Sequence, residues 1–398
     1  MQFRPRLYES ILKTHLTENR QMAFLTGPRQ VGKTTLSRSL AAVYLNWDTP
    51  DDRKTILTSM KTTMADVLAK PRVQKPIIVF DELHKNQRWK RFLKGFFDSY
   101  GDKCGVIVTG SSRMDVYQRG GDSLMGRYFL FHMHPLSVAE LIRQASPLKP
   151  IQTPAKIMES EFKALLEHGG FPEPFLKRSP TFDRQWRNLR RKQLLREEVR
   201  DTTRIHELAQ LEHLELLLAE RSGQQLIYGN LSAEIGVTVV TIRRWIETLI
   251  ALHQGFLIRP WHQNVSRSLR KEPKWYLRDW SGVADPGSKA ETMVACHLLK
   301  ATEGWTDLGL GDFELRYLRN KEKQEIDFII IRDRKPWFLV EVKKSDETIS
   351  PNLAYFQKQT KAEFAFQVVL DMPYIEFDCF KHHDPLVVPA RTFLSQLI

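Results

Sequence analysis

The sequence of 398 residues is long enough for two or three domains, each with a hydrophobic core. Its formal net charge of +13 at pH 7 favours a polyanionic partner, nucleic acid before an anionic membrane surface. The three cysteines lie far apart, which argues against a zinc site or a disulfide framework and is typical of a reducing compartment. Without a membrane-length apolar run or a signal peptide, we expect a soluble, cytoplasmic protein that does not enter the membrane.

The first elements expected along the chain surround a glycine-rich segment. Residues 1–20 have the spacing of a helix, 22–25 that of a buried strand, and 36–42 that of a second helix. The segment between them fits the phosphate-loop pattern G-x-x-x-x-G-K-[ST]. We expect it to bind ATP, with Lys33 on the β- and γ-phosphates and Thr34 on Mg²⁺. The predicted nucleotide-binding residues are Gly27, Pro28, Arg29, Gln30, Val31, Gly32, Lys33, Thr34 and Thr35.

Four more strands are expected before residue 150. The apolar runs that predict them are 43–47, 76–80, 105–109 and 128–131. Because helical stretches separate the strands, the pattern indicates a parallel sheet covered by helices on both faces. Asp81 and Glu82 follow the second run, where one carboxylate can complete the Mg²⁺ shell and the next can polarise the attacking water. The adjacent glutamate favours ATP hydrolysis over binding alone.

Two further positions of this region suit phosphoryl transfer. Ser111 or Ser112, at the end of a strand, is a candidate sensor of the γ-phosphate. Arg113 and Arg127 flank a glycine-rich loop, and a planar charged guanidinium can stabilise the phosphoryl transition state. Arg127 is the preferred arginine finger, with a structural ion pair as the alternative. A finger that acts on a second copy would make the active form a homo-oligomer.

A proline-punctuated stretch separates the predicted ATPase domain, residues 1–150, from a helical middle region, residues 151–278. Within the middle region, a short helix at 231–235, a turn at 236–238 and a longer helix at 239–252 are typical of a helix-turn-helix with a following wing. Such a module can contact DNA or another protein, so a protein partner remains an alternative to DNA.

Basic side chains of the middle region are candidates for DNA contact. On the second helix of the motif, Thr241, Arg243 and Arg244 can face a groove of the duplex. The wing residues that can contact phosphates are Arg267, Arg270, Lys271 and Lys274. A second basic stretch lies at 184–204, where the alternative is a solvated helix face.

The last region, residues 279–398, is expected to form a further α/β domain. A helix at 291–299 precedes strands at 313–318, 326–331 and 337–342. Asp327 lies on the second of these strands, and strand alternation places Glu341 and Lys343 on one face of the third, next to Asp327. Two carboxylates can hold Mg²⁺ there while the lysine positions or activates water beside a phosphodiester.

Two resemblances add to these patterns. The order Asp327, Glu341, Lys343 resembles the PD-(D/E)xK signature of restriction-endonuclease-like nucleases, whose helical acidic residue is matched by Glu291. The whole chain resembles the prokaryotic AAA-type ATPases that carry the C-terminal domain of unknown function 4143. The motifs that carry this resemblance are 27–35, 80–84, 109–112, 126–128, 134–137 and 169–173. It implies an ATPase core, a winged-helix segment and a nuclease-like C-terminal domain with Glu291, Asp327 and Glu341 as metal ligands.

The predicted fold is therefore α/β, with a P-loop NTPase parallel sheet, a winged-helix segment and a restriction-endonuclease-like domain. The predicted function is Mg²⁺-dependent ATP hydrolysis that acts on duplex or forked DNA, with metal-dependent cleavage through Glu341 and Lys343. Two alternatives remain. One is an ATP-gated DNA-binding module with a silent C-terminal domain, and the other is a nucleotide-gated switch whose later domains contact proteins.

Overall fold

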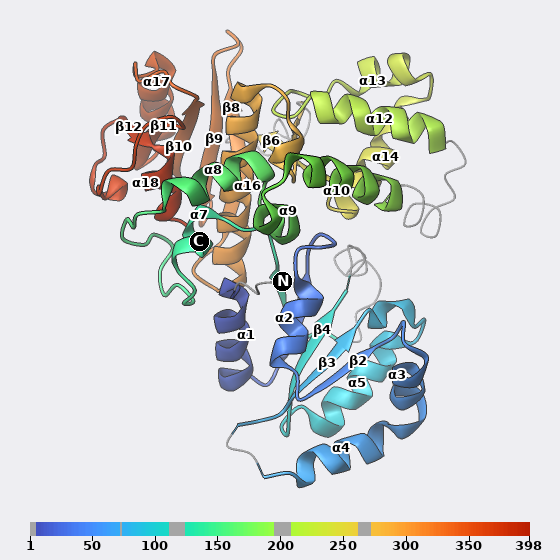
Figure 1. The fold of residues 1–398 in the computed structure, drawn as a ribbon. Coiled ribbons are helices and arrows are strands. Elements are labelled where there is room, and N and C mark those ends of the chain that lie inside the picture. The colour runs from blue at the N-terminus through green and yellow to red at the C-terminus, as the bar shows by residue number, and fades with distance from the viewer. Residues whose placement is uncertain (1–4, 72–73, 111–123, 195–207, 262–271) are drawn as a thin grey trace. The chain divides into compact units, whose positions relative to one another are not determined.

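The computed structural model describes residues 5–71, 74–110, 124–194, 208–261 and 272–398. Their contacts divide the chain into two units (Figure 1). Unit 1 is formed within residues 1–134 and 144–146, and unit 2 within residues 135–143 and 147–398.

Unit 1 is built around a parallel sheet with the strand order β2-β3-β4-β1-β5. Its strands are β1 (Met22–Thr26), β2 (Val43–Asn46), β3 (Ile77–Asp81), β4 (Gly105–Thr109) and β5 (Tyr128–His132). These are the strands expected from the apolar runs, with ends shifted by a residue at most. Because every neighbouring pair is parallel, the carboxyl ends of the strands meet at one edge of the sheet. That edge also carries the phosphate loop.

Helices cover both faces of this sheet, as predicted for a buried parallel sheet (Figure 1). The helices of unit 1 are α1 (Leu7–Glu18), α2 (Lys33–Leu40), α3 (Pro50–Lys54), the π-helix η1 (Thr55–Ser59), α4 (Met60–Ala69), the 3-10 helix η2 (Leu83–Lys85) and α5 (Trp89–Tyr100). Phe24 and Phe80 point to one face and pack with Leu93 and Phe96 of α5. The opposite face is covered by α1 and α2, which contact β1, β3 and β4.

Unit 2 contains a mixed sheet with the strand order β12-β11-β10-β9-β8-β6-β7. Its strands are β6 (Gly255–Pro260), β7 (Lys274–Leu277), β8 (Phe313–Arg319), β9 (Glu325–Arg332), β10 (Lys335–Lys343), β11 (Phe364–Val369) and β12 (Leu386–Pro389). The antiparallel β8, β9 and β10 confirm the three strands expected near the C-terminal carboxylates. Since β6 pairs with β8, strands on both sides of residue 278 share one sheet, and the predicted division into three domains stays a prediction.

The helices of unit 2 surround this sheet and an adjoining helical core. They are α7 (Val138–Ile142), α8 (Glu159–His168), α9 (Pro172–Lys177), α10 (Pro180–Gln193), α12 (Leu208–Glu220), α13 (Tyr228–Ile235), α14 (Val239–Ala251), η5 (Trp280–Gly282), α16 (Pro286–Asp307), α17 (Pro351–Thr360), η6 (Cys379–Lys381) and α18 (Ala390–Ser395). None of the helices in the described part of the chain is long and apolar enough to span a membrane.

The expected helix-turn-helix is formed by α13 and α14. Gly236 ends α13 with a φ of 78°, a backbone conformation that glycine adopts without strain. Thr238 then caps α14, because its hydroxyl accepts a hydrogen bond from the Thr241 backbone N–H. Both helices share a hydrophobic core with α12 and β7, centred on Trp245 and Trp275. The following hairpin of β6 and β7 occupies the position of the predicted wing.

Candidate functional site

The phosphate loop, residues 27–32, joins β1 to α2 at the carboxyl edge of the unit 1 sheet. Three of its residues have a positive φ: Gly27 at 140°, Gln30 at 62° and Gly32 at 102°. A Cβ atom on Gly27 would lie 2.2 Å from the Met133 carbonyl oxygen, so only glycine fits there. Residues with a positive φ allow the backbone N–H groups of a loop to turn toward a bound anion, so the loop is suited to phosphate.

Lys33 and Thr34 begin the helix that follows the loop. The Lys33 ammonium donates hydrogen bonds to the carbonyl oxygens of Gly27, at 2.7 Å, and Pro28, at 2.8 Å, so the side chain lies along the loop. The Thr34 hydroxyl donates to Asp81 Oδ2 at 2.9 Å. The two residues predicted to complete a magnesium shell are therefore in direct contact.

Asp81 is the last residue of β3 and accepts hydrogen bonds from hydroxyl groups on both neighbouring strands. Tyr44 of β2 donates to Oδ2, and Thr109 of β4 donates to Oδ1. Burial and the adjacent Asp81 carboxylate raise the pKa of Tyr44, which keeps its hydroxyl protonated as a donor. Sequence reasoning missed the roles of Tyr44 and Thr109. Their placement on strands beside β3 is the signal that points to them once the strand order is known.

Glu82, the predicted general base, follows Asp81 in a left-handed backbone conformation with a φ of 54°. Such a conformation is uncommon for a residue with a side chain and is often found at functional sites. Burial is the main cause that raises the pKa of Glu82, and the Asp81 charge adds to it. Two basic groups lie close to Glu82 Oε2, Lys85 at 3.5 Å and His84 at 3.7 Å. A carboxylate with a raised pKa beside a metal ligand can accept a proton from water.

Arg127 lies away from this edge. It precedes β5, whose first residue pairs with Met22 at the amino end of β1, one strand length of roughly 17 Å from the phosphate loop. Its guanidinium forms an ion pair with Asp98 of α5, with 3.0 Å between Nε and Oδ1. This is the structural ion pair considered as the alternative, and a finger that acts on a second copy stays a prediction. Ser111, Ser112 and Arg113 lie outside the described residues.

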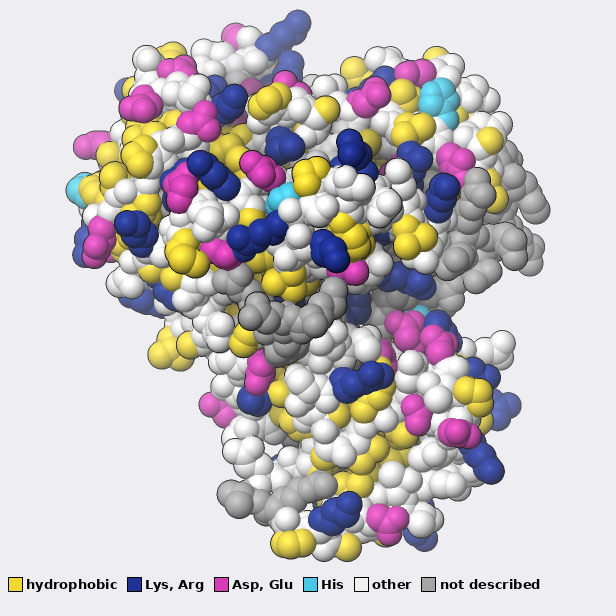
Figure 2. Space-filling view, viewed as in Figure 1, with side chains coloured by type: hydrophobic (Ala, Val, Ile, Leu, Met, Phe, Trp, Pro, Cys, Tyr) yellow, Lys and Arg dark blue, Asp and Glu magenta, His cyan; other side chains and the backbone are white. Residues whose placement is uncertain are grey.

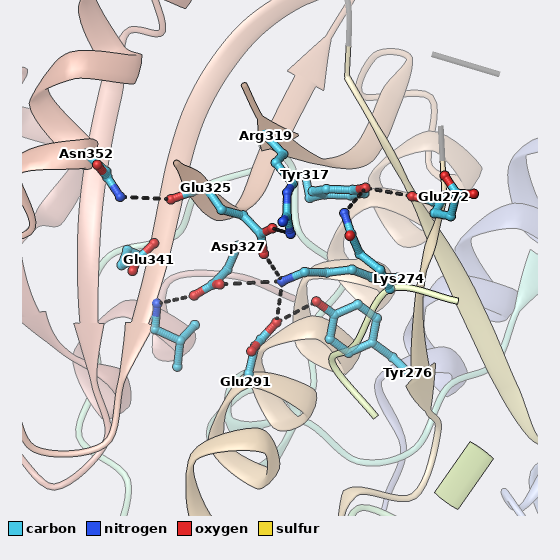
Figure 3. A network of polar contacts seen from close by, with 12 residues as sticks. Glu272, Lys274, Tyr276, Glu291, Tyr317, Arg319, Glu325, Asp327, Glu341 and Asn352 are labelled. Atoms are coloured by element: carbon cyan, nitrogen blue, oxygen red, sulfur yellow. Dashed lines mark hydrogen bonds and ion pairs between the residues drawn. The ribbon is translucent and has the colours of Figure 1, made fainter. Parts of the chain in front are cut away.

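A second group of acidic side chains lies in unit 2 (Figure 3). Asp327 of β9 lies close enough to Glu291 of α16 and Glu341 of β10 to raise the pKa of both carboxyl groups. Asp327 Oδ2 accepts a hydrogen bond from the Val342 backbone N–H at 2.8 Å, and the Lys343 ammonium lies 2.8 Å from Glu341 Oε1. The three predicted metal ligands and the predicted lysine therefore meet at one place, which we term the carboxylate cluster together with Glu325.

Lys274 was predicted on the wing as a phosphate contact, and this prediction is wrong. Its side chain is only 5% exposed and points into the carboxylate cluster (Figure 3). The ammonium lies 2.6 Å from Glu325 Oε1, 3.1 Å from Glu291 Oε1 and 3.7 Å from Asp327 Oδ1. Lys274 is the first residue of β7 and pairs with Ile258 of β6. Charge alone suggested a solvent-facing role and misled the sequence interpretation.

The electrostatics of the carboxylate cluster reflect its burial. Burial first, and the neighbouring Asp327 charge second, raise the pKa of Glu291 and of Glu341 to about 7. Burial of Lys274 opposes its charged form, but the surrounding carboxylates outweigh it and raise the pKa of that ammonium. Sequence reasoning also missed Tyr276, whose hydroxyl donates to Glu291 Oε1 at 2.6 Å. Among the described residues, no group of three or more His, Cys, Asp or Glu side chains is arranged to hold a metal ion.

The basic side chains of the middle region divide into engaged and exposed groups. On α10, Arg190 is buried, with its guanidinium 4.3 Å from the centre of the Phe171 ring. On α14, Arg243 and Arg244 are exposed, although the Arg243 guanidinium lies 4.3 Å from the centre of the Tyr228 ring. The predicted wing contacts Arg267, Arg270 and Lys271 lie outside the described residues. On the face shown in Figure 2, lysine and arginine side chains are interspersed with acidic ones rather than gathered in one patch.

The fold and the loop of unit 1 define the class of an AAA-type P-loop NTPase domain, and the family comparisons agree. Residues 19–142 match the AAA domain family, residues 159–284 match the domain of unknown function DUF8612, and residues 286–377 match the domain of unknown function DUF4143. The chain thus combines an AAA domain with a C-terminal DUF4143 domain, which confirms the architecture that its motifs resembled.

Comparisons with individual proteins are more distant. The uncharacterized proteins Rv2008c of Mycobacterium tuberculosis and Mb2031c of Mycobacterium bovis are each 25% identical over 262 residues, which cover 65% of this chain and 54% of each relative. The chain thus spans about half the length of these relatives. Among solved structures, Aeropyrum pernix ORC1 in complex with DNA is 14% identical, with a TM-score of 0.32 over 74% of this chain and 93% of that chain. AMPPCP-bound DnaA from Aquifex aeolicus is 12% identical, with a TM-score of 0.31 over 62% and 87%.

Proposed function

We propose that unit 1 binds ATP together with Mg²⁺ and hydrolyses it. The observation that carries this proposal is the contact of Thr34 with Asp81, at the edge that also holds the phosphate loop and Glu82. Thr34 and Asp81 would hold the metal ion, since hydroxyl and carboxylate oxygens are the ligands that Mg²⁺ prefers. When bound, the ion neutralises charge on the phosphate oxygens.

Other residues of unit 1 would bind the phosphates, orient Asp81 and accept a proton. The N–H groups of the loop bind the phosphates, and Lys33 exchanges its loop carbonyl partners for phosphate oxygens. Tyr44 and Thr109 hold the Asp81 carboxylate in place. Glu82 accepts a proton from the attacking water, a role supported by its raised pKa and its position next to Asp81.

Replacement of the loop lysine tests the nucleotide site. We expect Lys33→Ala to abolish binding of a fluorescent ATP analogue, because the variant has no cation to face the phosphates. Lys61→Ala, which removes an exposed lysine from α4, is the matched control and should bind like the wild type. Equal binding by both variants would contradict the assignment.

We propose further that the helix-turn-helix of unit 2 contacts DNA and that this contact changes ATP turnover. The support is the net charge of +13 and the exposed Arg243 and Arg244 on α14. A protein partner is the second candidate, because the start of α14 also exposes apolar side chains: Val240 is 76% exposed and Val239 is 38% exposed. We assign no cleavage step to Glu341 and Lys343, because a lysine ammonium already lies among the carboxylates.

DNA affinity as a function of salt distinguishes the two candidates. If the arginines bind phosphates, the affinity for duplex or forked DNA falls steeply with added salt. Replacing Arg243 and Arg244 together by alanine then reduces the salt slope by about one for each phosphate that the variant no longer neutralises. Val240→Ser is the control, since it changes the apolar surface and leaves the charge intact. DNA affinity that depends neither on salt nor on the two arginines would contradict DNA contact by α14 and would favour the protein partner.

A further inference from the structure

The carboxylate cluster of unit 2 does not fit the magnesium site that its nuclease-like sequence pattern predicts. A magnesium ion takes oxygen ligands at about 2.0–2.1 Å in octahedral geometry. The space between Glu291, Glu325 and Asp327 is instead taken by the Lys274 ammonium, with its shortest contact at 2.6 Å. A second positive charge at the same position would face strong repulsion at low dielectric.

The position of Lys274 is fixed by the strand that carries it. Lys274 pairs with Ile258 of β6 on one side and bridges to Gln225 on the other. The next residue, Trp275, is fully buried in the core shared by α12, α13 and α14. The backbone that carries Lys274 is therefore paired on both sides, which holds the start of its side chain beside the cluster.

The cluster also supplies what a buried ammonium needs. An ammonium has three N–H donors, and two acceptors lie within hydrogen-bond distance, on Glu325 and Glu291. The Asp327 carboxylate adds a third negative charge, and the Tyr317 ring lies with its centre 5.7 Å from Nζ. Arg319 and Lys343 pair with Glu325 and Glu341, so the acidic groups have basic partners from within the chain.

We propose that Lys274 is the resident cation of the carboxylate cluster and keeps divalent metal ions out of it. The nuclease-like domain is then closed to metal-dependent cleavage in this conformation, and the cluster acts as a structural joint between the wing strand β7, helix α16 and strand β9. This inference is independent of ATP hydrolysis, because it concerns another site.

Manganese binding to the full-length chain tests the inference. The probe is Mn²⁺ without nucleotide, measured by electron paramagnetic resonance, in a background that carries Lys33→Ala and Asp81→Asn so that the nucleotide site contributes nothing. We expect the background protein to bind no Mn²⁺ through the cluster. With Lys274→Met added, the protein should bind one Mn²⁺ ion with an affinity at least about tenfold above that of the background. Added Asp327→Asn should remove that ion. Lys274→Arg, which keeps a cation, and Lys335→Met, which removes an exposed lysine, should both behave like the background.

Three outcomes would overturn the inference. One is Mn²⁺ binding by the background protein that is lost on Asp327→Asn. Another is a folded Lys274→Met protein that binds no more Mn²⁺ than the background. The third outcome is measured on the unmodified wild type, so it can be tested even if Lys274→Met does not fold. The wild type is treated with an amine-reactive reagent, and acylation of each lysine is followed by mass spectrometry. We expect Lys274 to react at least about tenfold more slowly than exposed Lys335, and equal rates would contradict a buried, paired ammonium.

Discussion

Asp81 lies at the centre of the proposed nucleotide site. Hydroxyl groups from α2, β2 and β4 converge on its two oxygens, so the carboxylate is oriented before any ligand arrives. A buried carboxylate held by several donors keeps one geometry, which is what a ligand of a small hard cation requires. The pKa of the neighbouring Glu82 is raised, mainly by burial, and this suits proton transfer.

Glu82→Gln separates ATP binding from hydrolysis. The amide keeps the size of the side chain but cannot accept the proton of the attacking water. We expect turnover to fall by roughly 10²-fold or more while affinity for ATP stays within a few-fold of the wild type. Phosphate release and nucleotide binding, measured side by side, check this, with Glu18→Gln at the exposed end of α1 as the control. Unchanged turnover would show that another group acts as the base.

Gly27→Ala tests the shape of the phosphate loop. The added methyl carbon would meet the Met133 carbonyl oxygen at 2.2 Å, and the φ of 140° disfavours any side chain. We expect loss of ATP binding and a lower free energy of unfolding, by roughly 1–3 kcal/mol. Gly95→Ala is the matched control, because nothing lies within 4 Å of its added carbon and Gly95 is inside helix α5. In thermal unfolding, the midpoint temperature should fall in Gly27→Ala and rise in Gly95→Ala.

At the residue scale, sequence motifs predicted the loop and its acidic partners because each has a fixed local spacing. Tyr44 and Lys274 were not predicted in their observed roles, since the contacts that define them join strands distant in the chain. A tyrosine in a strand and a lysine in a hairpin have many ordinary uses. Only the strand order places the first beside Asp81 and the second among the carboxylates.

At the scale of elements, helix α16 runs across the unit 2 sheet and contacts β7, β8, β9 and β10. Sequence periodicity predicted a helix over 291–299, and the observed helix runs from Pro286 to Asp307. Asp285 caps its start by accepting from the Ser288 N–H, a signal that was present in the sequence. The strands β11 and β12 were not predicted, whereas β8, β9 and β10 carried clear apolar runs.

We expect the buried imidazole of His297, on α16, to make the stability of the fold depend on pH. Its Nε2 accepts from the Val138 N–H at 3.1 Å and its Nδ1 donates to the Met293 carbonyl, so the ring is neutral. Burial is the main cause that lowers the pKa of His297 to about 4 from the usual 6.5. The unfolded chain therefore binds a proton that the folded chain does not between these pH values. Above pH 6.5 the imidazole is neutral in both states and does not lower the free energy of unfolding. As the pH falls from 6.5 toward 4, the free energy of unfolding decreases, by up to about 3 kcal/mol.

His297→Gln checks this dependence, because glutamine can accept and donate but does not titrate. We expect the free energy of unfolding of the wild type to fall more steeply than that of the variant between pH 6.5 and 4. His213→Gln, at an exposed site on α12, should follow the wild type. Parallel curves for the wild type and His297→Gln would contradict a neutral buried imidazole.

At the scale of the whole molecule, Arg127 raises the question of a second copy. It lies at the amino edge of the unit 1 sheet, and the phosphate loop lies at the carboxyl edge, so Arg127 is distant from the proposed nucleotide site of its own chain. The sequence predicted Arg127 as a candidate from its neighbours alone. The sheet register, which no local pattern contains, separates it from the loop.

Mixing variants tests Arg127 as a finger in trans. We expect Arg127→Ala to lose turnover and to regain part of it when mixed with Glu82→Gln, because a mixed oligomer contains one site with both groups intact. Asp98→Ala breaks the same ion pair and is the control, which should keep its turnover. If Asp98→Ala loses as much activity as Arg127→Ala and mixing restores nothing, the arginine acts only through the structural ion pair.

The most direct test of the central claim is steady-state phosphate release from ATP and Mg²⁺ by the purified protein, with and without single-stranded, duplex and forked DNA. We expect the wild type to hydrolyse ATP, the activity to disappear in Lys33→Ala, and its rate to change with at least one form of DNA. Hydrolysis that persists in Lys33→Ala, or a wild-type protein that binds ATP and never turns it over, would contradict an ATPase centred on the phosphate loop.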